Sequence, residues 1–163
     1  MAISIESRSS ELTGVAPTAQ GNAKLQPNEQ GGRIRMARFS YTVPAGNEAD
    51  GNNIALCIVP NGARVLRVFV TFGAMGAGAQ LDLGIMGRDL NGFYDAAGTL
   101  ADDDDLFGAG QDVSAAGELT LADTIAQGYG TELDKDCFLV ATVENAAWAA
   151  ASALIGHVEY VVD

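Results

Sequence analysis

Apolar and polar residues alternate along short stretches of the chain from residue 33 onward, and glycine, proline and asparagine separate these stretches. Within residues 63–72, strict alternation places Leu66 and Val68 on one face of an extended backbone and Val65 on the other. Such alternation is typical of strands with one buried face. It predicts strands at Arg33–Val43, Asn53–Val59, Ala63–Phe72, Gln80–Ile85, Glu118–Leu121, Phe138–Glu144 and Ala153–Val162.

The segments between these stretches contain turn residues. In Pro60-Asn61-Gly62 the proline presets the second position of a turn, and Asn91-Gly92 is a typical hairpin dipeptide. We expect a further turn at Gly128-Tyr129-Gly130. Residues 94–115 are rich in Ala, Gly and Asp and alternate poorly, and for this region we expect a short helix near Leu100–Phe107.

About eight short strands without a long amphipathic helix predict an all-β fold, most simply a jelly-roll-like β-sandwich. This domain comprises residues 33–163. Residues 1–32 form a separate segment, rich in Ser, Gln, Asn and Gly, with too few apolar residues for a core. Two interpretations of this segment are open: a disordered tail on an isolated monomer, or an extended N-terminal arm that becomes ordered along a neighbouring subunit.

The chain has a formal net charge of −12, and the acidic excess lies in residues 101–163, where Lys135 is the one basic residue. An acidic surface repels phosphate groups, so we expect no nucleic-acid partner and no membrane partner. A basic or mixed-charge protein surface suits it better. The chain begins without an apolar signal-like run, and residues 146–156 are too few to span a bilayer, so we expect a soluble protein made in the cytoplasm.

No catalytic motif is evident in the sequence. His157 is the single histidine, and we interpret it as a half-exposed strand residue because no second histidine or cysteine pair stands near it to complete a transition-metal site. The chain has neither a Gly-x-Ser-x-Gly nucleophile motif nor a Gly-Lys-Ser/Thr phosphate loop. We interpret Cys57 and Cys137 as buried free thiols. We therefore expect a protein that is not an enzyme, without catalytic residues or a cofactor.

One run of four adjacent acids, Asp102, Asp103, Asp104 and Asp105, is the sharpest local feature. Carboxylate oxygens are the ligands that calcium prefers. However, the run lacks the alternating spacing of an EF-hand loop, and adjacent side chains point in different directions. We favour a solvated loop or a helix start, where acids complement the positive helix end. A calcium site and a docking patch for a basic partner are the alternatives.

Three arginines and one tryptophan are candidates for partner binding. Arg33 and Arg35 share one face of the first predicted strand, and Arg38 lies on the other face. The simple interpretation is that they are charged ends of an edge strand, which discourage aggregation. The alternative is that they bind carboxylates of a neighbouring chain, including the acidic region of another copy. Trp148 lies among alanines, which favours packing in the core or at a subunit interface.

Several stretches occur in a suggestive order: GRIRMARFSYTVPAGNEADGN, IALCIVPNGARVLRVFVTFGAMG, QLDLGI, LADTIAQGYGTEL and IGHVEYVVD. The succession of a strand, Pro-x-Gly-Ala-Arg-Val, a second strand, a glycine-rich loop and Leu-Asp-Leu-Gly is the most informative part. In this order, residues 33–163 resemble the small decoration (cement) proteins of phage and prophage heads. The resemblance implies a jelly-roll-like sandwich on the outside of a capsid, commonly a trimer that clamps neighbouring major capsid subunits. That family is not catalytic, so no active-site residue carries over.

We therefore expect a virion structural protein on the capsid surface, assembled in the host cytoplasm. Its expected partners are other copies of itself, with a homotrimer favoured, and the major capsid protein. A tail or neck component of the same virion is one alternative. A calcium- or carbohydrate-binding β-sandwich adhesion module is another, with Asp102–Asp105 as cation ligands and Trp148 and Tyr129 as sugar platforms.

Overall fold

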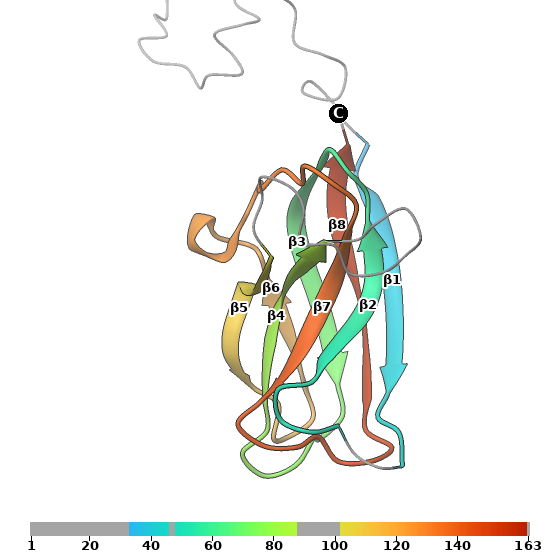
Figure 1. Cartoon of the computed structure of the whole chain (residues 1–163), viewed down its shortest axis with the longest axis vertical. Helices are drawn as coiled ribbons and strands as arrows, with labels where there is room; N and C mark the ends of the chain where they lie inside the picture. Colours follow the sequence, from blue (N-terminus) through green and yellow to red (C-terminus); the bar gives the residue numbers. More distant parts are fainter. Residues whose placement is uncertain (1–32, 46–47, 88–101, 163) are drawn as a thin grey trace, which may run out of the picture.

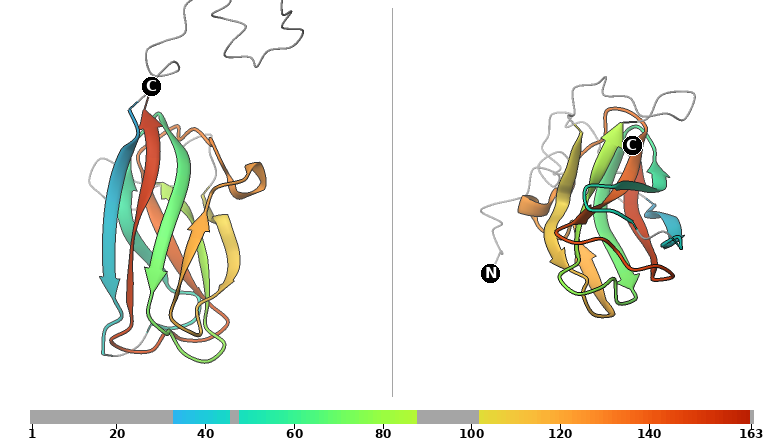
Figure 2. Two further views of the ribbon diagram at one scale, coloured as in Figure 1. Left: turned by 180° about the vertical axis from the view of Figure 1, so that it is seen from behind. Right: turned by 60° about the horizontal axis from the view of Figure 1, so that its bottom comes forward.

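The chain folds into two four-stranded antiparallel sheets packed face to face (Figures 1 and 2). The computed structural model describes residues 33–45, 48–87 and 102–162. Its elements are β1 (Arg35–Thr42), β2 (Asn53–Val59), β3 (Ala63–Phe72), β4 (Gln80–Gly87), β5 (Asp103–Asp112), β6 (Gly117–Leu121), the 3-10 helix η1 (Ile125–Gln127), β7 (Cys137–Glu144) and β8 (Ala153–Val162). The expected arm at residues 1–32 and the Asn91-Gly92 turn lie outside the described residues.

The order of strands is that of a jelly roll. One sheet has the order β1-β8-β3-β6 and the other has the order β2-β7-β4-β5, so the chain passes repeatedly from one sheet to the other. The expected all-β, jelly-roll-like sandwich is therefore confirmed. At one side of the molecule β1 lies over β2, and at the other side β6 lies over β5 (Figures 1 and 2).

The core between the sheets is mainly aliphatic, as the small aromatic share of the sequence requires. Inward-facing residues of neighbouring strands pair across the ladders, as Leu83 does with Ala141, and both are fully buried. A few aromatic rings fill the remaining space. The largest fully buried side chains are Trp148, Phe107, Met75, Leu81, Leu83, Ile85, Leu121, Leu133, Leu139, Leu154, Val43 and Val59.

A β-bulge in β3 changes which face its residues occupy. The register with β8 passes from Val65↔Tyr160 to Arg67↔Glu159, so Leu66 is an extra residue without a cross-strand partner. An extra residue shifts the alternation by one position. Val65 is therefore buried on the same side as Val68, whereas Leu66 is only half-buried. The sequence prediction that Leu66 and Val68 share the buried face is wrong for this reason.

The expected helix near Leu100–Phe107 is also wrong where the structure describes it, because residues 103–112 form strand β5. Its pairing with β4 is irregular: Leu83 pairs with Gly108, but Ile85 pairs with Asp103, so β5 contains extra residues between these points. The backbone of Asp103 and Asp104 passes directly over Gly84 of β4. Local sequence does not favour a strand here, and the edge of β4 imposes it.

Trp148 and its neighbour Ala149 connect the loops at one end of the sandwich through hydrogen bonds. Its side chain is fully buried, and its indole Nε1 donates a hydrogen bond of 3.0 Å to the carbonyl oxygen of Gln80. Its backbone pairs with Glu48 in both directions, and the neighbouring Ala149 donates to the carbonyl oxygen of Met75. We call this the Trp148 end. The opposite end, where β1 begins and β8 finishes, is called the terminal end (Figure 1).

The two cysteines are free thiols, as expected, and neither forms a disulfide. Cys137 is buried, whereas Cys57 is only half-buried. Burial raises the pKa of the Cys57 thiol to about 12 and that of Cys137 to about 11, so both are protonated and unreactive at neutral pH. Among the residues described, no helix is long and apolar enough to cross a membrane.

We predict that Gly84→Ala destabilises the domain. A Cβ at residue 84 would lie 2.0 Å from the carbonyl oxygen of Asp103, so β5 would have to move away. We expect a loss of about 1–3 kcal/mol in the free energy of unfolding, measured by urea titration. Gly73→Ala is the matched control, because its Cβ would come no closer than 3.6 Å to the backbone of Ala153. Equal stability of the two variants would contradict the close packing of β5 on Gly84.

Candidate functional surfaces

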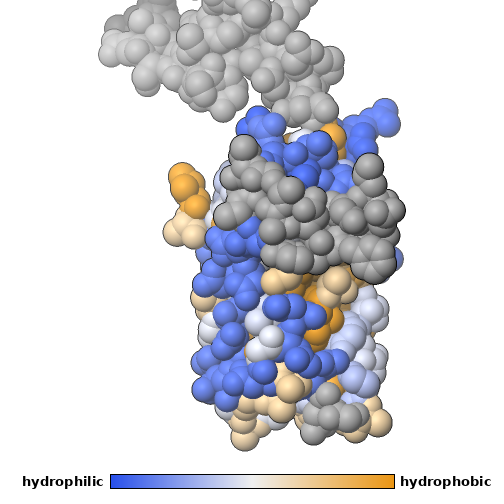
Figure 3. Space-filling view, in the orientation of Figure 1, coloured by the Kyte–Doolittle hydropathy of each residue, from blue (hydrophilic) through white to orange (hydrophobic). Residues whose placement is uncertain are grey.

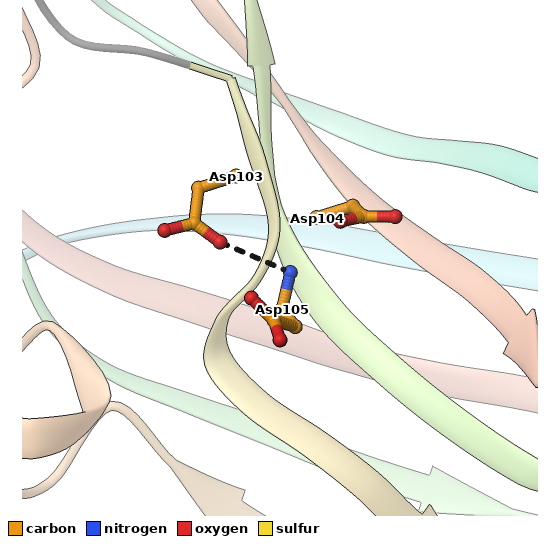
Figure 4. Close-up of side chains that lie close together, drawn as sticks. All are labelled: Asp103, Asp104 and Asp105. Carbon is orange, nitrogen blue, oxygen red and sulfur yellow. Dashed lines mark hydrogen bonds between the residues drawn. The ribbon is translucent and has the colours of Figure 1, made fainter.

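The run of four acids lies at the start of edge strand β5. Within it, the side chain of Asp104 lies on one side of the strand, and those of Asp103 and Asp105 lie on the other (Figure 4). One carboxylate oxygen from each of Asp103, Asp104 and Asp105 can be found within 4.8 Å of the others. Asp103 Oδ1 accepts a hydrogen bond of 3.4 Å from the backbone N–H of Asp105. The run is a strand start rather than the solvated loop or helix start that we favoured.

Two of these acids interact with other strands. Asp102 Oδ1 accepts a 2.7 Å hydrogen bond from the backbone N–H of Gly87 and lies 3.8 Å from Lys135 Nζ. Asp104 Oδ2 lies 3.3 Å from the hydroxyl of Thr142, a residue that is only 3% exposed. Asp102 therefore joins the start of β5 to the end of β4, and Asp104 joins it to β7. Asp105 is the exposed acid of the run, and Asp103 is half-buried beside it.

The close approach of the acids changes their protonation. The pKa of the Asp103 carboxyl lies above its usual value, first because it shares a hydrogen bond with the Asp105 carboxyl, and then because it is partly buried. Two carboxylates held this close repel when both are ionised. A cation would relieve the repulsion, but calcium takes roughly six to eight oxygen ligands and Asp104 is already engaged with Thr142. Calcium binding stays a prediction.

An open pocket of about 460 Å³ lies between β5 and η1. The segment that carries η1 projects beyond β5 and β6, and it presents hydrophobic residues at its tip (Figures 1 and 3). Ile125 in this segment is 90% exposed and Tyr129 is 51% exposed. The turn expected at residues 128–130 is present, since Gly128 adopts a left-handed backbone that closes η1. The pocket is lined by Asp103, Asp105, Leu106, Gly108, Ala109, Gln111, Ala126 and Gln127.

We define the acidic edge by five exposed or half-exposed residues that lie around this pocket or in the η1 segment. The sequence identified the acids of β5 as candidates, but it did not predict that Ile125 belongs to the same surface. An isolated isoleucine between Thr124 and Ala126, in a short segment that ends at a glycine, was the available signal. The acidic edge comprises Asp103, Asp105, Asp123, Ile125 and Tyr129.

The three arginines lie on the opposite side of the molecule: Arg35 and Arg38 in β1, and Arg33 two residues before it. This strand has β8 on one side only, so it is an edge strand, as the simple interpretation of these residues predicts. All three are exposed, and within the part of the chain that the structure describes none of them forms an ion pair. Between them lie two large apolar side chains that are also exposed. We define the basic edge as Arg33, Ile34, Arg35, Met36 and Arg38.

Trp148 and His157 belong to neither edge. Trp148 is 0% exposed, so its ring packs within the domain and is not presented to a partner or a sugar in this structure. His157 is half-buried on β8, as expected. Its ring stacks on Phe69 with 5.7 Å between centroids, and its Nε2 lies 3.5 Å from Glu159. These contacts give His157 a structural role in the outer face of the sheet.

No protein-family model matches the sequence, and no curated protein matches it. The fold is similar to that of chains in two solved phage structures. One is the capsid of Ralstonia phage GP4, with a TM-score of 0.65 and 18% identity over 81% of this chain and 86% of that chain. The other is the capsid asymmetric unit of cyanophage Pam1, with a TM-score of 0.62 and 17% identity over 91% of this chain and 98% of that one.

We predict that Asp103→Asn stabilises the domain at neutral pH. A carboxyl whose pKa is raised by folding costs stability when it is ionised, and this cost disappears as the pH falls below the ordinary carboxyl range. Because solvent screens charges on a group this exposed, we expect a gain of only about 0.5 kcal/mol at pH 7, narrowing towards zero at pH 3, in urea titrations. Glu118→Gln, on exposed β6, is the control and should change little. A gain that persists at low pH would exclude charge repulsion as its cause.

Proposed function

We propose that this protein is a phage virion structural protein that binds the outside of the capsid shell as a decoration, or cement, protein. The observation that carries the proposal is the similarity of almost the whole chain to chains in two phage capsid structures. The likeness spans most of each compared chain, so the match is between whole units of similar size. Because sequence identity is low, the likeness by itself supports only a shared fold. The shared role is our proposal.

The distribution of chemistry in the described part of the chain supports a role in binding rather than catalysis. The one histidine stacks on Phe69, and burial raises the pKa of both thiols, which disfavours the reactive thiolate form. Most of the large exposed apolar side chains instead lie at the two sides of the sandwich, close to charged residues. Repeated contacts of this kind suit a protein that acts in many copies, because multivalent attachment multiplies modest affinities.

The N-terminal residues complete the proposed mode of attachment. Residues 1–32 join the domain at the terminal end, directly before the basic edge. We propose that they form an arm that becomes ordered on the shell or on a sister subunit, while the sandwich provides a rigid body. The protein then resides on the virion surface, with the major capsid protein as its partner and a trimer as the favoured assembly.

Two other roles remain as alternatives. A tail or neck protein of the same virion would use the same edges, and it would bind those structures rather than shells. A calcium-dependent adhesion module is favoured only by the approach of Asp103, Asp104 and Asp105. Under that alternative, millimolar calcium should raise the melting temperature of the wild type but not that of Asp103→Asn.

We predict that the full chain binds expanded capsid shells lacking this protein, and that the arm contributes much of the affinity. Deletion of residues 2–32 should weaken binding by about a hundredfold or more, equivalent to about 3 kcal/mol, because the arm loses its ordered contacts. Co-sedimentation with purified shells measures the affinity, and urea unfolding checks that the domain still folds.

A chain with residues 2–32 shuffled is the matched control, since it keeps length and charge. It should bind as weakly as the deletion. Strong binding by the shuffled chain would show that the arm's sequence is not recognised. Absence of shell binding by the intact protein would overturn the proposed function itself.

A further inference from the structure

The large exposed apolar side chains are concentrated at the two sides of the sandwich. Ile34 and Met36, which are 63% and 53% exposed, belong to the basic edge, and Ile58 lies on β2 at the same side. Ile125 and Tyr129 belong to the acidic edge. Exposed apolar residues that are clustered and surrounded by charges mark interaction surfaces in soluble proteins.

The two edges carry opposite charge and lie on opposite sides of the molecule. β1 and β2 are the first strands of their sheets, and β6 and β5 are the last. The basic edge follows β1. The acidic edge follows β5 and the η1 segment, and these two elements are in contact with each other. No single copy can therefore bring its own two edges together.

Both edges lie towards the terminal end of the sandwich. Arg35 pairs with Tyr160 near the end of β8, which places the basic edge there. On the other sheet, the end of β2, the start of β7 and the end of β4 form one row across the sheet. Val59 pairs with Cys137, and Cys137 pairs with Gly87. β5 begins beside this row, where Asp103 pairs with Ile85. In Figure 1, β1 and β5 both run downward, away from the terminal end, and β5 begins lower than β1.

We propose that the basic edge of one copy binds the acidic edge of the next copy, with the sandwiches standing side by side and pointing the same way. Opposite charges then meet in the half of the sandwich towards the terminal end, and Ile125 packs against the apolar residues between the arginines. A symmetric contact of two like edges would instead oppose charges of the same sign. A contact between two different edges is heterologous, and repeated with rotation it closes a ring.

This inference deepens the proposed function, because it names the surfaces through which a decoration protein forms its oligomer. It rests on the charge and exposure of the two edges and needs no shell to test. Self-association of the purified chain and its binding to shells are separate measurements. Failure of the first with success of the second overturns only this inference, and the reverse overturns only the proposed function.

Charge reversal with rescue tests the contact in the full chain. Arg35→Glu with Arg38→Glu makes both edges acidic, and Asp105→Arg with Asp123→Arg makes both edges basic. Each double variant should weaken self-association by about a hundredfold or more in sedimentation velocity. The chain with all four substitutions has complementary edges again, and it should recover an oligomer with the mass of the wild-type one.

The apolar part of the contact has its own matched pair. Ile125→Ser should weaken self-association by about tenfold, because it removes the most exposed apolar side chain of the acidic edge. Ile155→Ser, at an exposed isoleucine on β8 outside both edges, should leave the oligomer unchanged. Circular dichroism of each variant confirms that it folds.

Three outcomes would overturn the proposal. The wild type is a monomer at all concentrations, or neither charge reversal changes the mass of its oligomer, or the four-substitution chain stays monomeric although it folds. An oligomer that dissociates in both double variants and returns when they are combined supports it. The mass of the restored oligomer, divided by the 16.8 kDa of the chain, then gives the number of copies in the ring.

Discussion

Burial of apolar side chains between the two sheets is the interaction on which the rest of the structure depends. Each sheet contributes one face, and fully buried pairs such as Leu83 and Ala141 leave little space between strands. A sandwich of this kind cannot hide the outermost strands of either sheet. Unpaired strand edges therefore lie on β1 and β2 at one side and on β5 and β6 at the other.

The bounds of three strands could be predicted from the sequence to the residue. Asn53–Val59, Ala63–Phe72 and Ala153–Val162 have the expected bounds because turn residues mark the ends of these apolar stretches, although a register shift changes the alternation inside the first two. β5 could not be predicted, since a run of aspartates followed by Gly and Ala has no strand propensity of its own. It becomes a strand because β4 offers an unpaired edge and Gly84 leaves room above it. The bulge at Leu66 was equally hidden, because the missing cross-strand partner belongs to β8.

The candidate surfaces were predicted in part. Charged residues at the start of the first strand identify an edge, and Arg35 and Arg38 are exposed as expected. The sequence also shows that acids predominate after residue 100. It does not reveal that Asp102 and Asp104 are engaged by neighbouring strands while Asp103 and Asp105 approach each other. Nor does it place the acids opposite the arginines, because that depends on the order of strands in two sheets.

The buried Trp148 gives the chain a built-in optical reporter with a defined location. It is the one tryptophan, so selectively excited indole emission comes from the end where Glu48, Gln80 and Met75 meet. The arginines and the η1 segment lie towards the other end of the sandwich. A red shift of this emission therefore signals that the indole has lost its apolar cage, whereas separation of intact subunits leaves the spectrum unchanged. Without any added label, the emission of Trp148 therefore distinguishes unfolding of the domain from dissociation of folded subunits.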